Sequence, residues 1–510
     1  MPNAFAYIML FGWPLVVAVL FHALPLQKAL IWSLVAGYLL LPSNMGVNLP
    51  MVPTIDKTLV PSLSAALMCW VVSRRRSATM APRGTDQLVG EARGREGWMI
   101  GSLLVLLFAT PFVTAMQNVD PLIFGPRFIP GLRLYDALSL AAGLGIAFIP
   151  FLLARRFLAT AEAHRWLLVV LVVAALAYSL LILFEVRMSP QLHRWIYGYF
   201  PSLFQQAIRG DGFRAVVFLN HGLLVGAFLA MAVLAACALW RQSLRERVSA
   251  MPWLFAGGWL LVTLLLSRNL GATALAMLFA PVILFAPLRL QLVLAAVIAG
   301  AVLVFPLLRG AGWVPTVAIH SMAEAVNPER AQSLQFRFDH EDALLARANE
   351  KPFGGWGSWG RNRIFDPVTG ADLSVTDGYW VIVIGTYGWL GYVAQFGLMT
   401  LPILMLAFRH RPDLQPATTG LVLIAAIGLI DLIPNSGRTP VFLMVCGALA
   451  GYCLTPHKRP LSRNGRTENP KSLASSAKDG PVQAAMVAPA RRHIRRPRGL
   501  SPSHASHSEQ

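Results

Sequence analysis

The sequence predicts an all-α integral membrane protein with about 12 or 13 transmembrane helices and one large loop on the outer face. Two observations lead to this fold class. Of the 510 residues, 56% are hydrophobic and only 13% are charged, whereas a soluble protein carries about 25% charged residues. Apolar runs that could cross a hydrocarbon core of ~30 Å as helices also recur along the whole chain.

The apolar runs give the order of the expected elements. The candidate spans are residues 5–24, 26–41, 59–73, 98–116, 134–154, 166–184, 216–240, 252–266, 270–288, 290–308, 379–408, 420–433 and 441–454. Arginines gather after the third, fifth, seventh, ninth and eleventh spans. Because positively charged loops stay in the cytoplasm, these loops are expected to be cytoplasmic and the intervening loops to face outward.

This topology divides the chain into five parts. We expect N-terminal spans with a basic cytoplasmic loop, a central bundle, a large outer loop, C-terminal spans and a disordered basic tail. Their bounds are 1–97, 98–309, 310–378, 379–455 and 456–510. The net charge of +19 would suggest nucleic acid as a partner of a soluble protein. Here the basic residues lie in short loops and in the tail, which predicts contact with membrane lipids and not with nucleic acid.

The large outer loop contains a predicted helix that carries most of its charge. Residues 327–329, Asn-Pro-Glu, have the order of a helix start, and the helix is expected to end near Lys351. At ~3.6 residues per turn, Arg337, His340 and Glu341 share one face. This face either is solvated, as in an interfacial helix, or presents Arg337 and His340 to a ligand.

A glycine–tryptophan segment follows this helix, with the sequence GGWGSWG at residues 354–360. Its glycines would leave backbone amides exposed. Trp356 and Trp359 would either stack on sugar rings or lie at the membrane interface. The segment lacks the Gly-Lys-Ser/Thr end of a nucleotide-binding P-loop, which excludes that type of site.

Several arginines lie at the outer ends of spans, where the distribution of charge usually disfavours them. Arg214 precedes the seventh span, Arg268 lies in a tight turn, and Arg438 lies between the last two spans. Guanidinium binds pyrophosphate oxygens in pairs and stays charged when partly desolvated. Each arginine could instead extend toward lipid headgroups. As a set, they favour an anionic, lipid-linked ligand.

His221 lies about two turns inside the seventh candidate span. An ionisable group at such a depth is costly and is often functional, which makes His221 a candidate for substrate binding. The alternative is a neutral, hydrogen-bonded histidine packed between helices. Asp431, near the outer end of the twelfth span, is expected to pair with Arg438.

Three stretches resemble motifs of the O-antigen ligase and O-antigen polymerase superfamily of bacterial membrane glycosyltransferases. Residues 267–277, SRNLGATALAM, are similar to its Ser-Arg-Gly-Ala turn. Residues 336–360, FRFDHEDALLARANEKPFGGWGSWG, are similar to its Arg, Ala-Leu and Pro-x-x-Gly-x-Gly pattern. Residues 376–397, TDGYWVIVIGTYGWLGYVAQFG, are similar to its third motif, and the resemblance covers roughly residues 100–455.

The resemblance implies a GT-C-like, metal-independent enzyme without a cofactor in the bacterial inner membrane, with its large loop in the periplasm. The donor would be an undecaprenyl-pyrophosphate-linked glycan and the acceptor a glycan or lipid-linked glycan, with other polysaccharide assembly proteins as candidate partners. Arg268 and Arg337 match the family's motif arginines, and Arg214 matches a further one less firmly. They would bind the pyrophosphate and stabilise it as a leaving group.

The third stretch departs from the pattern of the ligases, which place a histidine where this chain has Thr376 and Asp377. Asp377 and His340 are therefore both candidates for the general base. The departure favours a polymerase or exopolysaccharide enzyme over a ligase. A lipid-linked oligosaccharide flippase and a non-catalytic assembly scaffold are the alternatives. A transporter needs ionisable groups around a midplane cavity, whereas here they cluster at the outer ends of spans.

Overall fold

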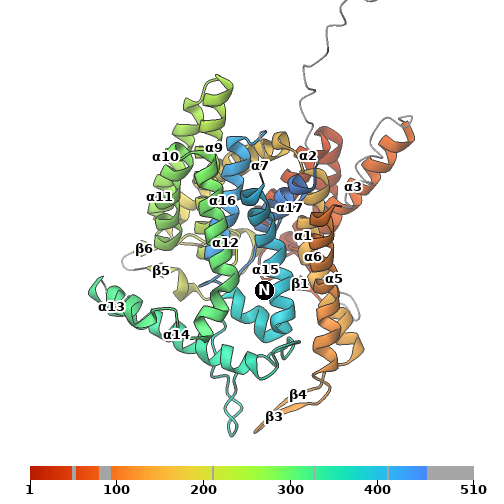
Figure 1. The fold of residues 1–510 in the computed structure, drawn as a ribbon, viewed down its shortest axis with the longest axis vertical. Helices are drawn as coiled ribbons and strands as arrows, with labels where there is room; N and C mark the ends of the chain where they lie inside the picture. The colour runs from red at the N-terminus through yellow and green to blue at the C-terminus, as the bar shows by residue number, and fades with distance from the viewer. Residues whose placement is uncertain (49–52, 80–93, 210–211, 327, 410–412, 456–510) are drawn as a thin grey trace, which may run out of the picture. The chain divides into compact units, whose positions relative to one another are not determined.

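A computed structural model describes residues 1–48, 53–79, 94–209, 212–326, 328–409 and 413–455, and helices dominate them (Figure 1). In chain order the helices are α1 (Ala4–Ala23), α2 (Leu26–Leu40), α3 (Leu59–Thr79), α5 (Arg95–Met116), α6 (Leu134–Phe157), α7 (Ala161–Met188), α8 (Leu192–Tyr197), α9 (Gly222–Glu246), α10 (Met251–Leu266), α11 (Leu270–Phe285), α12 (Leu288–Gly310), α13 (Thr316–Val326), α14 (Pro328–Asn349), α15 (Tyr379–Phe408), α16 (Pro416–Asp431) and α17 (Pro440–Leu454). A 3₁₀ turn, η1, spans Phe204–Ala207.

Each of the thirteen predicted spans overlaps a helix. Among the residues that the structure describes, seven helices are long and apolar enough to cross a membrane, namely α1, α5, α6, α7, α9, α12 and α15. The apolar helices α2, α10, α11, α16 and α17 are shorter. The structure therefore supports a multi-pass membrane protein. The basic segment 80–93, the tail 456–510 and the predicted cap Asn327 lie outside the described residues.

Strands occur in the described ranges only as three short antiparallel hairpins. They pair β1 (Gly46–Val47) with β2 (Ile55–Asp56), β3 (Leu122–Phe124) with β4 (Arg127–Ile129), and β5 (Ile208–Arg209) with β6 (Gly212–Phe213). The third hairpin precedes α9 and brings Arg209 and Arg214 to the end of that helix. It is the hairpin that matters for the candidate site.

Helix α9 is surrounded by α7, α10, α11 and α16, which lie side by side in Figure 1. Small residues allow the close approach. A Cβ on Gly420 of α16 would lie only 2.3 Å from the Cβ of Ala238, and a Cβ on Gly226 would lie 2.7 Å from the Asn269 side chain. The start of α9 is thereby fixed beside the turn between α10 and α11.

The predicted start of the seventh span was wrong. The sequence predicted a helix from residue 216, but α9 begins at Gly222, and Val217 has a left-handed φ of 52°. Such a backbone costs a β-branched residue about 1–3 kcal/mol. The carboxylate of Glu185, on α7, accepts the N–H groups of Val216 at 2.9 Å and Val217 at 2.7 Å and supports this turn. His221 consequently lies at the N-cap of α9 and not two turns inside a span.

The predicted loop helix is confirmed as α14, which packs against α13 and α15. Helix α15 is interrupted at Gly388, where φ is 67° and ψ is −173°. The glycine–tryptophan segment fills this interruption. The N–H of Trp356 donates to Gly385 O at 2.8 Å, that of Gly357 to Thr386 O at 2.9 Å, and that of Trp389 to Pro352 O at 2.7 Å. The amides that the sequence suggested would be exposed are therefore used inside the fold.

Candidate functional site

A cavity of about 1010 Å³ lies where the N-terminal end of α9 meets the α10–α11 turn and the end of α16. Arg209, Arg214 and Arg268 line its polar side. The apolar side is lined by Leu223, Leu265, Leu270, Leu275, Leu278 and Ile430. The lining thus combines three guanidinium groups and the Asp431 carboxylate with a larger number of apolar side chains. Arg214 and Arg268, predicted from separate stretches, are brought together here.

Arg268 occupies the turn between α10 and α11 in a left-handed conformation, with φ of 57°. Asn269 braces the turn, because its Nδ2 donates to Ser267 O at 3.2 Å and to Ser267 Oγ at 3.0 Å. Arg268 Nη1 donates to Arg209 O at 2.5 Å, and a Cβ on Gly212 would lie 2.7 Å from the guanidinium carbon. Backbone strain of this kind persists where neighbouring structure holds it, and it is common at binding sites.

Arg214 is 9% exposed and lies between the β5–β6 hairpin and α9. The backbone N–H of Arg214 donates to Ala207 O at 2.7 Å. The side chain lies across the first residue of α9, since a Cβ on Gly222 would approach Arg214 Cδ to 2.3 Å. Glycine at position 222 therefore makes room for the path of Arg214 into the cavity wall.

His221 caps α9 through its ring, because Nδ1 accepts the N–H of Leu223 at 3.1 Å. A neutral ring that accepts at Nδ1 carries its proton on Nε2. Burial, followed by the charges of Arg214 and Arg209, lowers the pKa of His221. The imidazole is therefore neutral near pH 7, which agrees with the alternative of a neutral, hydrogen-bonded histidine.

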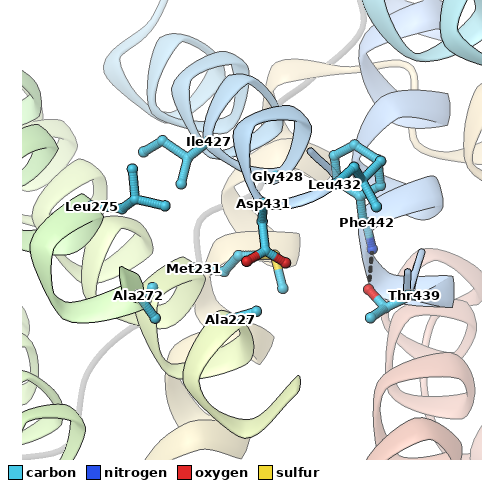
Figure 2. Close-up of a pocket in the computed structure, with 12 residues that line it drawn as sticks. Ala227, Met231, Ala272, Leu275, Ile427, Gly428, Asp431, Leu432, Thr439 and Phe442 are labelled. Atoms are coloured by element: carbon cyan, nitrogen blue, oxygen red, sulfur yellow. Dashed lines mark hydrogen bonds between the residues drawn. The ribbon is translucent and has the colours of Figure 1, made fainter. Parts of the chain in front are cut away.

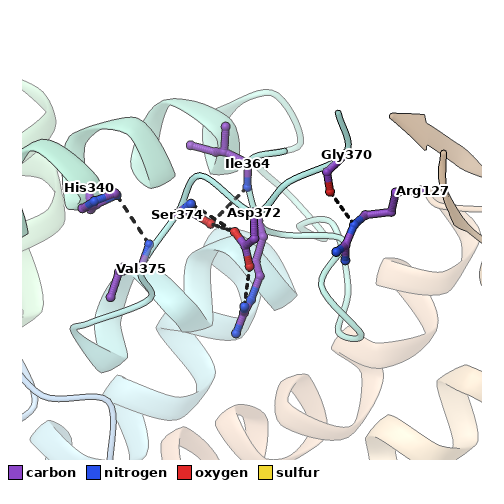
Figure 3. A network of polar contacts seen from close by, with 8 residues as sticks. Arg127, His340, Ile364, Gly370, Asp372, Ser374 and Val375 are labelled. Atoms are coloured by element: carbon purple, nitrogen blue, oxygen red, sulfur yellow. Dashed lines mark hydrogen bonds and ion pairs between the residues drawn. The ribbon is translucent and has the colours of Figure 1, made fainter. Parts of the chain in front are cut away.

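Arg337 and Asp377 form an ion pair at the edge of the cavity, with 3.4 Å between Nε and Oδ2. Arg337 Nη1 also lies 3.5 Å from the carbonyl oxygen of Pro434, a residue that lines the cavity. His340, one turn along α14, accepts the N–H of Val375 at Nδ1 over 3.4 Å (Figure 3). The structure thus joins the predicted residues of α14 to the segment that precedes α15.

Gly378 makes the approach of this segment possible. Its φ is 79°, and a Cβ there would lie 2.6 Å from Ile433 O and 3.2 Å from Glu341 Oε1. Glu341 is only 5% exposed. Burial raises its pKa to about 7, against the opposing effect of Arg309. A second carboxyl group therefore lies beside Asp377 and titrates near neutral pH.

Arg438 does not line the cavity. Its Nη1 donates to Gln395 Oε1 at 2.6 Å and to the Tyr379 hydroxyl, so it ties α15 to the segment between α16 and α17. The expected pair with Asp431 is not formed, because Asp431 Oδ1 accepts from Asn435 Nδ2 at 2.8 Å. Arg438 is better interpreted as a structural residue than as a ligand contact.

The two tryptophans differ. Trp356 is 7% exposed, its Nε1 donates to Arg347 O at 2.7 Å, and the Arg347 guanidinium lies 3.4 Å from the ring centre. The predicted stacking of Trp356 on a sugar is therefore corrected, because packing inside the loop covers the ring. Trp359 is 55% exposed and retains a face that a sugar or lipid could contact.

A smaller, mostly apolar cavity of about 30 Å³ adjoins the larger one and shares Ala272, Leu275 and Asp431 with it. Figure 2 shows the Asp431 carboxylate between Ala227 and Met231 of α9 and the start of α17. Sequence analysis missed Arg209, Asn269 and Asp431 as cavity residues. The signal for Arg209 was a second arginine in the same predicted loop, residues 185–214, as Arg214.

Comparisons of this chain with protein-family models, curated proteins and solved structures found no match.

Proposed function

We propose that this chain is a membrane glycosyltransferase of the polymerase or exopolysaccharide type, with a GT-C-like arrangement. It would act at the outer face of a bacterial inner membrane, with the loop 310–378 in the periplasm. The donor would be an undecaprenyl-pyrophosphate-linked oligosaccharide and the acceptor a glycan hydroxyl.

The lining and the volume of the cavity support this proposal. Three guanidinium groups against one carboxylate, Asp431, leave the lining with an excess of positive charge, and its leucines add apolar surface. This combination suits a ligand with an anionic head and a hydrocarbon tail. Its volume of about 1010 Å³ leaves room for a pyrophosphate together with part of a prenyl chain. A simple headgroup anchor would not need arginines from two separate segments around one cavity.

In the proposed reaction, the acceptor oxygen forms a bond to the anomeric carbon while the bond from that carbon to the pyrophosphate oxygen breaks. Undecaprenyl pyrophosphate leaves with the electron pair, and a base accepts the proton of the hydroxyl. Arg214 and Arg268 stabilise the charge that develops on the leaving oxygen. Arg337, at the cavity edge, orients Asp377 and adds to the positive field.

The geometry favours Asp377 over His340 as the base. His340 uses Nδ1 to accept the Val375 N–H, which leaves its neutral ring protonated at Nε2 without a second lone pair. Asp377 has two carboxylate oxygens, and its contact with Arg337 involves Oδ2. A carboxylate can accept a further hydrogen bond from an acceptor hydroxyl.

The proposal is tested by comparing lipid-linked glycans and polymer length in cells with and without this gene. A polymerase predicts accumulation of single lipid-linked repeats when the gene is absent. Full-length polymer that lacks its final attachment would instead indicate a ligase. Lipid-linked glycan trapped on the cytoplasmic side would indicate a flippase, and unchanged glycans would contradict any transfer role.

A further inference from the structure

The segment between Arg214 and His221 is held by groups that come from distant parts of the chain. Glu185, at the end of α7, is fully buried. Its Oε2 accepts the N–H groups of Val216 at 2.9 Å and Val217 at 2.7 Å. Its Oε1 accepts the N–H of Leu192 at 3.0 Å. One carboxylate therefore joins α7, α8 and the turn that leads into α9.

The next residue of the turn, Phe218, is held on both sides of its backbone. Its N–H donates to the Tyr178 hydroxyl at 3.0 Å. Its carbonyl oxygen accepts from Ser43 Oγ at 2.7 Å and from Lys57 Nζ at 3.1 Å. These contacts stabilise a left-handed backbone conformation at Val217. Without them a β-branched residue would avoid this conformation, since a φ of 52° is a steric outlier for it.

The turn has no charged side chain of its own, but it separates two cavity elements. Arg214 precedes it and lines the cavity, while the helix that it starts contributes Leu223 to the cavity wall. If residues 216–221 continued α9 as the apolar pattern predicts, Arg214 would lie just before the start of a longer helix and not before this turn. The contacts of Glu185 hold the backbone two and three residues after Arg214.

We propose that Glu185 is a positioning residue for Arg214, which it places in the cavity wall by clamping the left-handed turn at Val217. The catalytic meaning of this role rests on the proposed function, but the placement of Arg214 does not. In the described part of the chain, the hydrogen bonds to the Glu185 carboxylate come from backbone groups, and Glu185 is not assigned a part in the reaction itself.

The test measures how fast an arginine-selective dicarbonyl, phenylglyoxal, modifies Arg214 in the detergent-purified full chain, with mass spectrometry to locate the label. Glu185→Gln removes one acceptor oxygen from the clamp, so labelling of Arg214 should accelerate several-fold. Adding Val217→Gly should return the rate toward that of the wild type, because glycine adopts a positive φ without steric cost. Glu246→Gln is the matched control, since Glu246 bonds Gln242 at the opposite end of α9.

Unchanged labelling of Arg214 in Glu185→Gln would overturn the inference, as would an acceleration that Val217→Gly fails to reverse. If Glu185→Gln does not fold, Tyr178→Phe decides, because it removes only the hydroxyl that accepts the Phe218 N–H. A smaller acceleration is expected there, and none would contradict the clamp. Faster labelling of Arg214 with unchanged glycan transfer would support the clamp and count against the proposed donor site.

Discussion

Two regions of the molecule contain arginines among polar and aromatic residues, but the arginines have different partners in each. In the cavity, Arg214 and Arg268 line an open volume bounded by leucines. Directly after the glycine–tryptophan segment, Arg361 is 1% exposed and donates to the carbonyl oxygens of Trp356 at 3.2 Å, Pro130 at 2.7 Å and Asp120 at 2.9 Å. The comparison shows that the groups around a guanidinium, and not its neighbours in sequence, distinguish a candidate ligand-binding arginine from a structural one.

The largest effect is expected at Arg268. Arg268→Lys should reduce glycan transfer by about 10²–10³-fold, since an ammonium cannot reproduce the paired hydrogen bonds of guanidinium to a pyrophosphate. Transfer is measured in membrane vesicles that contain the native lipid-linked donor, normalised to inserted protein. Arg363→Lys is the control, because Arg363 pairs with Asp372 away from the cavity. Wild-type transfer by Arg268→Lys would remove the cavity from the mechanism.

The second prediction concerns the base. Asp377→Asn should lower the transfer rate by about 10²-fold, in line with the usual contribution of general base catalysis. His340→Ala should lower it by less than about tenfold, because its Nδ1 serves a backbone contact. Single-turnover rates of both variants provide the measurement. The reverse order of the two losses would assign the base to His340.

Arg361 sharpens the contrast with Arg268. Arg361→Lys should lower the free energy of unfolding by about 2–4 kcal/mol, because buried carbonyl groups would lose charged donors. Transfer per folded molecule should remain close to wild type. Thermal unfolding in detergent, followed alongside the transfer assay, separates the two quantities. A loss of transfer at unchanged thermal stability would show that Arg361 belongs to the site.

The smallest effect is a pH dependence of stability. Burial raises the pKa of Glu341 from an ordinary value of 4.5 to about 7. Between these values the folded state binds more protons than the unfolded state, so stability should fall as pH rises through this window and level off above it. Glu341→Gln should flatten this part of the profile of melting temperature against pH. An equal slope in the variant would show that another group is responsible.

Much of the fold could be predicted because apolar runs of sufficient length specify helices without help from distant residues. The α14 helix followed from a local pattern, and the grouping of Arg214 with Arg268 followed from their positions at the ends of apolar runs. The start of α9 could not be predicted. Residues 216–220 are as apolar as a helix, and the acceptor that removes them from it, Glu185, lies more than 30 residues away in sequence.

The prediction that the amides of the glycine–tryptophan segment are exposed was wrong for a related reason. Its composition is the same whether its amides bind a ligand or fill an interruption in another helix. Only the break in α15 at Gly388 decides between these outcomes, and that break depends on carbonyl groups of Pro352 and Phe353 packed against it. The sequence alone likewise does not predict that Arg347 covers the ring of Trp356.

The central claim is that the arginine cavity binds a prenyl pyrophosphate. The most direct measurement is the affinity of the purified protein for farnesyl pyrophosphate in detergent, compared between the wild type and the Arg214→Ala/Arg268→Ala double variant, with farnesol as the uncharged control. We predict that the wild type binds farnesyl pyrophosphate and that the double variant binds it at least tenfold more weakly. A tenfold loss is roughly the contribution of one charge-assisted contact. The affinity for farnesol should show no matching loss. Equal affinity of both proteins for farnesyl pyrophosphate would contradict it.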